Sequence, residues 1–192
     1  MTRADAIGAI LDNLEANDLS LFTTGMISRE AHAAFDRSSN FYMIGSMGLL
    51  SAIGLGLALN RPDRRVVVVE GDGSALMSLG SFPLVATEAP SNYTHVVLDN
   101  ESYESTGNQP TISSRVDITR HAEASGYAAA VRATCLETFA QTFIQHRASS
   151  GPTFLLAKVG GRVSHDISRV EMTPTELRDR FLGAVMDGRG KS

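Results

Sequence analysis

The sequence predicts an α/β protein built on one doubly wound parallel sheet with helices on both faces. Short β-branched runs typical of strands buried on both faces, such as VVVVE at 66–70, alternate with stretches of helical spacing. Strands separated by helices indicate βαβ units and therefore a mainly parallel sheet. No linker long enough to divide the chain interrupts this alternation, so the 192 residues (1–192) are expected to form a single domain.

The first third of the chain predicts a helix, a strand and two further helices. Apolar residues at helical spacing predict a helix over 3–16, and the apolar run LSLF predicts a strand at 19–22 that leads into a polar loop. A second helix is expected over 28–35, because its first residue is a serine that can cap it. The segment 40–48 then passes from apolar residues into glycine, and a helix rich in glycine and alanine follows it.

Strands and helices alternate through the remainder of the chain. Strands are expected at 66–70, 93–99, near 127–131 and at 152–159. Helices are expected directly after residue 74, and at 117–125, 135–148 and 173–186. The last of these helices has threonine at its cap and proline in its first turn, which is a frequent way to begin a helix.

The composition excludes several classes of protein. Lys and Arg number 17 against 21 Asp and Glu, a formal charge of -4, so nucleic acid held through phosphate contacts is not an expected partner. The single cysteine, Cys135, excludes an internal disulfide and a cysteine-built zinc site. Residues 1–20 lack a secretory signal, and no apolar run is long enough to span a membrane. The protein is therefore expected to be cytoplasmic, with no membrane partner.

Two strand ends carry the residues best suited to bind a ligand. In an open parallel sheet, ligands bind beyond the carboxyl ends of the strands, which here are followed by residues 71–74 and 100–111. The glycines of GDGS (71–74) let the backbone come close to a ligand, and the helix that begins there is a natural phosphate site. Asp72 and Asn100 supply a carboxylate and an amide oxygen, which suit octahedral Mg²⁺ when phosphate oxygens complete the set.

The pair GDGS and LDN, each after a buried strand, resembles the cofactor signature of thiamine diphosphate enzymes. The resemblance extends through FYMIGSMGLLSAIGLGLAL, RVVVVEGDGSALMSLGSF and VVLDNESYESTGNQPT, and it covers about residues 3–160. These segments are similar to the diphosphate-binding part of decarboxylases that act on sulfopyruvate or phosphonopyruvate. The resemblance implies the thiamine diphosphate-binding fold and one subunit of a Mg²⁺-dependent 2-oxo acid decarboxylase. Conversion of 3-sulfopyruvate to sulfoacetaldehyde and CO₂ is the expected reaction, and phosphonopyruvate is the alternative substrate.

The resemblance also implies which residues bind metal and substrate. Asp72 and Asn100 would bind Mg²⁺ through their side chains, and Ser102 through its carbonyl oxygen. In the family, the loop that follows lies over the thiazolium ring and the substrate. Glu104 and Thr106 are therefore the candidates for substrate contact or proton transfer.

Cofactor contacts are implied for residues of four segments. The Gly45 carbonyl would accept a hydrogen bond from the aminopyrimidine amino group, and Met47 would be the apolar wedge that bends the cofactor. The full set is Thr24, Gly25, Gly45, Ser46, Met47, Gly71, Gly73, Ser74 and Tyr103. Glu70 receives no role from either the pattern or the resemblance. His165 lies in a segment, GGRVSHD (160–166), for which approach to the anionic substrate or to the partner chain is one hypothesis. His95, inside a strand, is expected to be a satisfied core or interface histidine rather than a base.

The resemblance implies that this chain holds half of an active site. In the family, the glutamate that activates the cofactor lies on a separate pyrimidine-binding domain, so a partner (alpha) subunit, or a second copy of the chain, would supply it in an oligomer. The helix at 47–59 is either the interface for this partner, since small residues permit close helix approach, or a core helix on the sheet. Two other hypotheses are a non-catalytic thiamine diphosphate-binding module and a dinucleotide-binding domain, which the missing glycine fingerprint disfavours.

Overall fold

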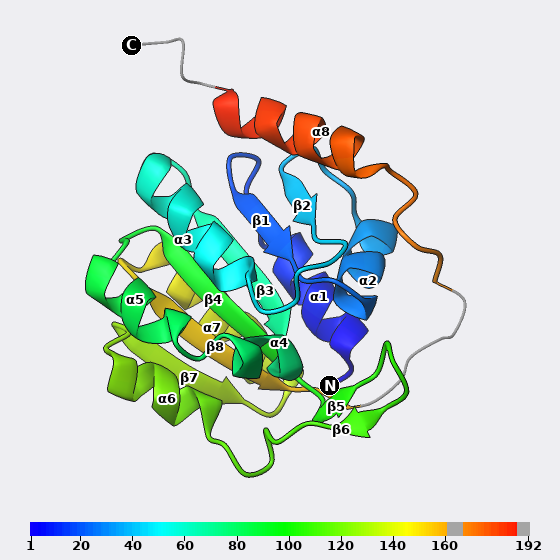
Figure 1. Ribbon diagram of the computed structural model, residues 1–192. Coiled ribbons are helices and arrows are strands. Elements are labelled where there is room, and N and C mark those ends of the chain that lie inside the picture. The colour runs from blue at the N-terminus through cyan, green and yellow to red at the C-terminus, as the bar shows by residue number, and fades with distance from the viewer. Residues whose placement is uncertain (161–166, 188–192) are drawn as a thin grey trace.

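The computed structural model describes residues 1–160 and 167–187, and its centre is a six-stranded sheet in which neighbouring strands are parallel (Figure 1). The strand order is β2-β1-β3-β4-β8-β7. The strands are β1 (Leu19–Phe22), β2 (Asn40–Tyr42), β3 (Val66–Gly71), β4 (Tyr93–Asp99), β7 (Ala129–Ala133) and β8 (Thr153–Lys158). A separate antiparallel hairpin joins β5 (Ser102–Tyr103) to β6 (Gln109–Pro110). His165 lies outside the described residues.

Helices cover both faces of the sheet, which confirms the doubly wound α/β fold. They are α1 (Arg3–Asp12), α2 (Met26–Ala34), α3 (Leu50–Asn60), α4 (Asp72–Met77), α5 (Ser81–Glu88), α6 (Ile118–Ser125), α7 (Leu136–Ala148) and α8 (Pro174–Met186). One buried apolar cluster contains residues of α1, α2 and α7, and the other contains residues of α3, α5 and α6. Helix α8 contributes to both clusters and lies along the outer strand β2 (Figure 1). Over the described ranges, none of the helices has the length and apolar character that crossing a bilayer requires.

The predicted elements are found, and the differences concern short segments. Strands β1 and β4 have the predicted bounds, 19–22 and 93–99. Strand β2 was not predicted, because three residues at a sheet edge carry too little periodicity. The single helix predicted after GDGS is two helices, α4 and α5, separated by a turn.

Helix α3 approaches the sheet through Gly54. A Cβ atom at Gly54 would lie 2.2 Å from Cγ2 of Val68 and 3.1 Å from Cε2 of Tyr93, so a side chain at this position would overlap the sheet. On the other side of the helix, Ile53 and Leu59 are 38 % and 46 % exposed. The helix is thus a core helix on one side, while its other side is apolar and exposed in this chain.

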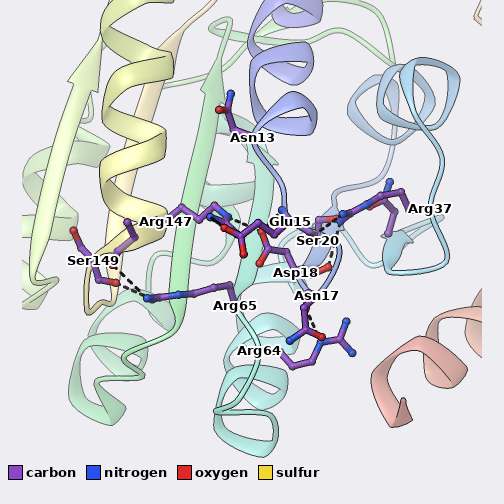
Figure 2. A network of polar contacts seen from close by, with 12 residues as sticks. Asn13, Glu15, Asn17, Asp18, Ser20, Arg37, Arg64, Arg65, Arg147 and Ser149 are labelled. Carbon is purple, nitrogen blue, oxygen red and sulfur yellow. Dashed lines mark hydrogen bonds and ion pairs between the residues drawn. The ribbon is translucent and has the colours of Figure 1, made fainter. Parts of the chain in front are cut away.

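Arginines brace the loops at the amino ends of the strands (Figure 2). The Nε of Arg147 donates to Oδ2 of the buried Asp18, and its Nη1 pairs with Glu15 at 2.9 Å. Arg65, just before β3, donates from Nη1 to the carbonyl oxygen of Ser149 at 2.8 Å, which ties this strand to the end of α7 (Figure 2). These contacts fix the end of the sheet opposite to the carboxyl ends of the strands.

The topology opens a crevice between β1 and β3. From β1 the chain crosses to β2 on one side, and it then returns to form β3 on the other side of β1. At such a reversal, the loops at the carboxyl ends of the two strands leave in opposite directions, and doubly wound sheets bind their ligands there. The loop after β1 and the GDGS segment after β3 flank this crevice.

Candidate cofactor site

The loops after β1, β3 and β4 enclose a cavity at the crevice, together with Met47 and the start of α1. All of the residues predicted to bind metal, cofactor or substrate line this cavity, except Gly25, Gly45 and Ser46. The lining residues are Arg3, Thr23, Thr24, Met26, Ile27, Met47, Gly71, Asp72, Gly73, Ser74, Leu98, Asn100, Ser102, Tyr103, Glu104, Ser105 and Thr106. The fold thus brings together segments that are far apart in the sequence.

Asp72, the first residue of α4, is a buried carboxylate with 1 % of its surface exposed. Burial raises the pKa of Asp72 above its ordinary value, and the neighbouring Asp99 carboxylate raises it further. A hydrogen bond that Thr111 Oγ1 donates to Asp72 Oδ2 offsets only part of this effect. Within the described part of the chain, no cation pairs with Asp72, so a bound cation would stabilise its charged form.

Asn100 begins the loop after β4 and orients the hairpin that follows. Its Oδ1 accepts the backbone N–H of Ser102 at 3.1 Å, and its Nδ2 donates to Oε2 of Glu104 at 3.3 Å. The preceding residue, Asp99, is paired with Lys158, whose Nζ lies 2.9 Å from Oδ2. Asp99 therefore anchors the loop to β8, which leaves Asn100 as the residue of the pair that lines the cavity.

The side chains of Tyr103 and Met47 pack against the backbone of α4 at Gly73. A Cβ atom at Gly73 would lie 2.3 Å from Cε1 of Tyr103 and 3.2 Å from Cε of Met47. Only a glycine leaves both side chains in these positions. The contact brings together three residues that the sequence predicted as cofactor-binding.

The hydroxyl of Ser74 is bound within the protein. Its Oγ donates to Oε2 of Glu70 at 2.6 Å and accepts the N–H of Gly48 at 3.2 Å. Ser74 is fully buried although it lines the cavity. A diphosphate contact by Ser74 would therefore use its backbone N–H rather than its hydroxyl.

Arg3 is the residue of the site that the sequence analysis missed. Its Nε and Nη2 donate to the two carboxylate oxygens of Glu30 at 2.9 and 2.6 Å, and its Nη1 donates to Glu104. Burial lowers the pKa of Arg3, but the hydrogen bonds that Arg3 donates to Glu30 and Glu104 raise it more, so the guanidinium stays charged. No motif connects positions this far apart in the chain, and only the packing of α1 on α2 reveals the cluster.

Of the remaining predicted residues, Gly25, Gly45 and Ser46 do not line the cavity, whereas Thr106 does. Gly45 and Ser46 are exposed in the segment between β2 and α3. Gly25 caps α2 with a φ of 95°, and its Cβ position lies 3.4 Å from Oγ of Ser105 in the hairpin loop. Thr106 is exposed and donates from Oγ1 to Oε1 of Gln109 at 3.0 Å, a bond within the loop.

The donors fit Mg²⁺ with a diphosphate better than a softer metal. A carboxylate from Asp72 and an amide oxygen from Asn100 are hard ligands, and the neighbouring Gly71 and Gly73 add no side chain beside them. Within the described ranges, no three His, Cys, Asp or Glu side chains are grouped so that they could hold a metal, which argues against a zinc site. The carboxylates of Asp72 and Glu104 also make the cavity attractive to a cation.

Comparison with known proteins gives the family. The family described as "Thiamine pyrophosphate enzyme, C-terminal TPP binding domain" matches residues 23–157. The chain is 41 % identical over 184 residues to the phosphonopyruvate decarboxylase of Streptomyces viridochromogenes, covering 96 % of this chain and 46 % of that protein. It is 38 % identical over 185 residues to sulfopyruvate decarboxylase subunit beta of Methanothermobacter thermautotrophicus, covering 96 % of each. The chain thus spans less than half of the first relative and nearly all of the second.

Solved structures share the fold. The benzoylformate decarboxylase of Polynucleobacter necessarius superposes with a TM-score of 0.72 at 18 % identity, over 85 % of this chain and 34 % of that chain. A thiamine diphosphate-dependent 4-hydroxybenzoylformate decarboxylase of Rhodococcus jostii RHA1 gives a TM-score of 0.71 at 19 % identity, over 85 % and 33 %. The chain belongs to the thiamine pyrophosphate enzyme family, among the relatives of phosphonopyruvate decarboxylase and of the sulfopyruvate decarboxylase beta subunit.

Proposed function

We propose that this chain is the diphosphate-binding subunit of a thiamine diphosphate- and Mg²⁺-dependent 2-oxo acid decarboxylase. The substrate we favour is 3-sulfopyruvate, which would yield sulfoacetaldehyde and CO₂, with phosphonopyruvate as the alternative. The observation that carries the proposal is the convergence of Asp72, Gly73 and Asn100 at the crevice between β1 and β3. The near full-length similarity to beta subunits named for sulfopyruvate supports the choice of substrate.

The metal would be held by residues from two neighbouring strands. Asp72 follows β3, and Asn100 and Ser102 follow β4, which pairs with β3 directly. We assign the Asp72 carboxylate, the Asn100 amide oxygen and the Ser102 carbonyl to Mg²⁺. The ion would neutralise the buried charge of Asp72 and hold the diphosphate near the backbone of Gly71 and Gly73.

The other residues of the cavity would position and shield the reacting groups. Thiamine diphosphate, when bound, supplies a carbanion nucleophile and an electron sink for decarboxylation. Met47, half-buried against Gly73, would support the apolar side of the cofactor. Glu104 and Thr106 would face the substrate from the hairpin loop. In this arrangement Glu104 is bound to Arg3, so proton transfer by Glu104 would require this ion pair to loosen.

The sulfonate or phosphonate group would be recognised mainly by the partner. Arg3 is the one cation among the described lining residues, and its charge is already matched by Glu30 and Glu104. An added anion would therefore meet a cavity that is negative before Mg²⁺ binds. We infer that the cation that selects the substrate comes from the partner (alpha) subunit, together with the glutamate that activates the cofactor.

The partner would approach the exposed side of α3 and the mouth of the cavity. Gly45 and Ser46, which we assign to the aminopyrimidine side of the cofactor, are exposed there. Ile53 and Leu59 extend this surface with apolar side chains. Relatives named "subunit beta" support a two-subunit enzyme.

Two measurements test the proposal, one on the chain and one on its complex. Isothermal titration calorimetry of the chain with thiamine diphosphate, with and without Mg²⁺, measures cofactor binding. Mild affinity purification of the tagged chain from its native cells, with both ligands in the buffer, yields the complex for assays of CO₂ release from sulfopyruvate and from phosphonopyruvate. We expect Mg²⁺-dependent binding and release of CO₂ from sulfopyruvate by the complex.

The possible outcomes separate the hypotheses. Preference for phosphonopyruvate would transfer the assignment to the alternative substrate. A chain that purifies alone, binds the cofactor and releases no CO₂ is a non-catalytic binding module. Binding of NAD with no need for Mg²⁺ would refute the cofactor assignment itself.

A further inference from the structure

A line of buried hydrogen bonds runs from the interior of the sheet to the cofactor site. His95 on β4 contacts Tyr127 through Nδ1 at 3.1 Å and Glu70 through Nε2 at 2.8 Å. The other oxygen of Glu70 accepts from Oγ of Ser74 at 2.6 Å, and Ser74 in turn accepts the N–H of Gly48 at 3.2 Å. Glu70, His95 and Ser74 have no exposed surface. The line therefore connects β3, β4 and α4 to the segment that carries Met47.

One assignment of donors satisfies every group in this line. The Tyr127 hydroxyl donates to His95 Nδ1, and His95 donates from Nε2 to Glu70. As a carboxylate, Glu70 accepts this bond and also the bond from the Ser74 hydroxyl. The hydroxyl proton of Ser74 is then directed to Glu70, and its lone pairs are left for the N–H of Gly48.

Without Glu70, the Ser74 hydroxyl would lose its fixed direction. The Glu70 carboxylate is the acceptor of the Ser74 hydroxyl, and it reaches Ser74 from β3, before the helix begins. A hydroxyl group rotates to suit its partners, so without this acceptor its proton would be free to point elsewhere. A Ser74 hydroxyl that rotated would no longer present the same lone pair to Gly48.

The position of Gly48 sets the position of Met47. Gly48 has a φ of 90°, and its Cβ position lies 3.0 Å from Cβ of Met77, so this turn is packed tightly against the end of α4. The adjacent Met47 lines the cavity and lies next to Gly73. A shift of the Gly48 amide would therefore move the Met47 side chain.

We propose that Glu70 and His95 are positioning residues that act through the Ser74 hydroxyl to hold Gly48 and Met47 against the cofactor site. The link to cofactor binding rests on the proposed function, whereas the link to Met47 rests on the hydrogen bonds alone. Neither residue touches the cavity, and both lie behind it. This role explains why an acid, Glu70, occupies a buried position on β3, for which the sequence analysis found no reason.

The test compares three variants of the full chain. Ser74→Ala removes the hydroxyl, Glu70→Leu removes its acceptor, and Glu70→Gln keeps an acceptor for Ser74 and a group that can bond His95. Thr153→Val is the matched control, because it also removes one buried hydroxyl from the core, on β8, away from the site. The readouts are the amide signal of Gly48 and the ¹³C-methyl signal of Met47 by NMR, and thiamine diphosphate affinity with Mg²⁺ by calorimetry.

We expect Ser74→Ala and Glu70→Leu to shift both NMR signals and to weaken cofactor binding by about three- to tenfold, the loss that one hydrogen bond corresponds to. Glu70→Gln should restore both, and Thr153→Val should change neither. If Glu70→Leu does not fold, Ser74→Ala alone decides, since it keeps the Glu70–His95 pair. Unchanged Gly48 and Met47 signals in Ser74→Ala would overturn the proposal. A wild-type complex of the chain with its partner that binds no cofactor would refute the proposed function instead, and the NMR signals would still test the positioning role.

Discussion

Replacing Asp72 by asparagine should stabilise the metal-free chain and abolish its response to magnesium. In the wild type, the buried Asp72 carboxylate lies near Asp99, and no cation of residues 1–160 or 167–187 pairs with it. An asparagine keeps an oxygen that can accept the Thr111 hydrogen bond, and it removes the charge. A buried charged group without a matching partner costs free energy that a neutral side chain of the same shape avoids. A buried polar group left unsatisfied costs about 1–3 kcal/mol, so we expect a gain on the order of 1 kcal/mol, or ~2–4 °C in Tm for a chain of this length.

The pH dependence of this difference follows from the direction of the pKa shift. Because the pKa of Asp72 is raised above its ordinary 3.8, the folded chain retains a proton that the unfolded chain loses near that pH. The stability of the wild type therefore falls as pH rises from about 3.8 through the folded pKa of Asp72. Below this pH window the wild type and the Asp72→Asn variant should have equal stability. Above it the variant should be more stable than the wild type by the full amount.

Urea unfolding measures both effects. We would compare the proteins in EDTA at pH 7 and then with saturating Mg²⁺ and thiamine diphosphate, where ligand at 100 times its Kd adds about 2.7 kcal/mol to the wild type. The variant should gain nothing from the ligands. Asp12→Asn, at an exposed position of α1, makes the same change in charge and should stay within about 0.5 kcal/mol of wild type. A metal-free Asp72→Asn chain that is less stable than wild type would refute the reasoning.

Three further predictions concern substitutions at Gly54, Arg3 and Gly73. Gly54→Ala should lower the free energy of unfolding by about 1–3 kcal/mol, because its Cβ overlaps the sheet. Gly56→Ala on the same helix has nothing within 4 Å of its Cβ position and should raise the free energy of unfolding by up to about 1 kcal/mol. If urea unfolding ranks the two variants the other way, the packing of α3 is contradicted. Arg3→Leu should lower stability by about 3–5 kcal/mol, because it leaves two buried carboxylates without a cation, and Arg3→Lys should recover part of this in the same measurement. Gly73→Ala should retain the fold by circular dichroism and lose thiamine diphosphate binding by calorimetry, because the new Cβ overlaps the adjoining tyrosine ring.

The sequence predicted the fold where burial is continuous along a segment. Strands β1 and β4 are buried at every residue and are rich in apolar residues, so their bounds could be predicted from the sequence. The periodicity of α3 could not decide between a core and an interface helix, because apolar residues surround it. Gly54 and Ile53 are adjacent in sequence, yet one is packed on the sheet and the other is exposed.

The candidate site was predictable to the extent that it lies in short motifs at strand ends. GDGS and LDN provide Asp72 and Asn100, and parallel strands bring their ends to one edge. Arg3 was not predictable, since its partners are 27 and 101 residues away and only tertiary packing joins them. Glu70 stood out in the sequence without an explanation, because its role depends on the contact with His95 in the neighbouring strand. The prediction that His95 is a satisfied core residue is confirmed.

The arginine contacts at the amino ends of the strands have an evolutionary consequence. Arg65 and Arg147 fasten the base of the sheet, so part of the bracing of the fold lies at the end away from the site loops (Figure 2). Such a scaffold tolerates insertions, deletions and new side chains at the rim while its core remains intact. Relatives with different substrates can thus diverge by remodelling one edge, and laboratory selection for a new 2-oxo acid should begin with the hairpin loop there.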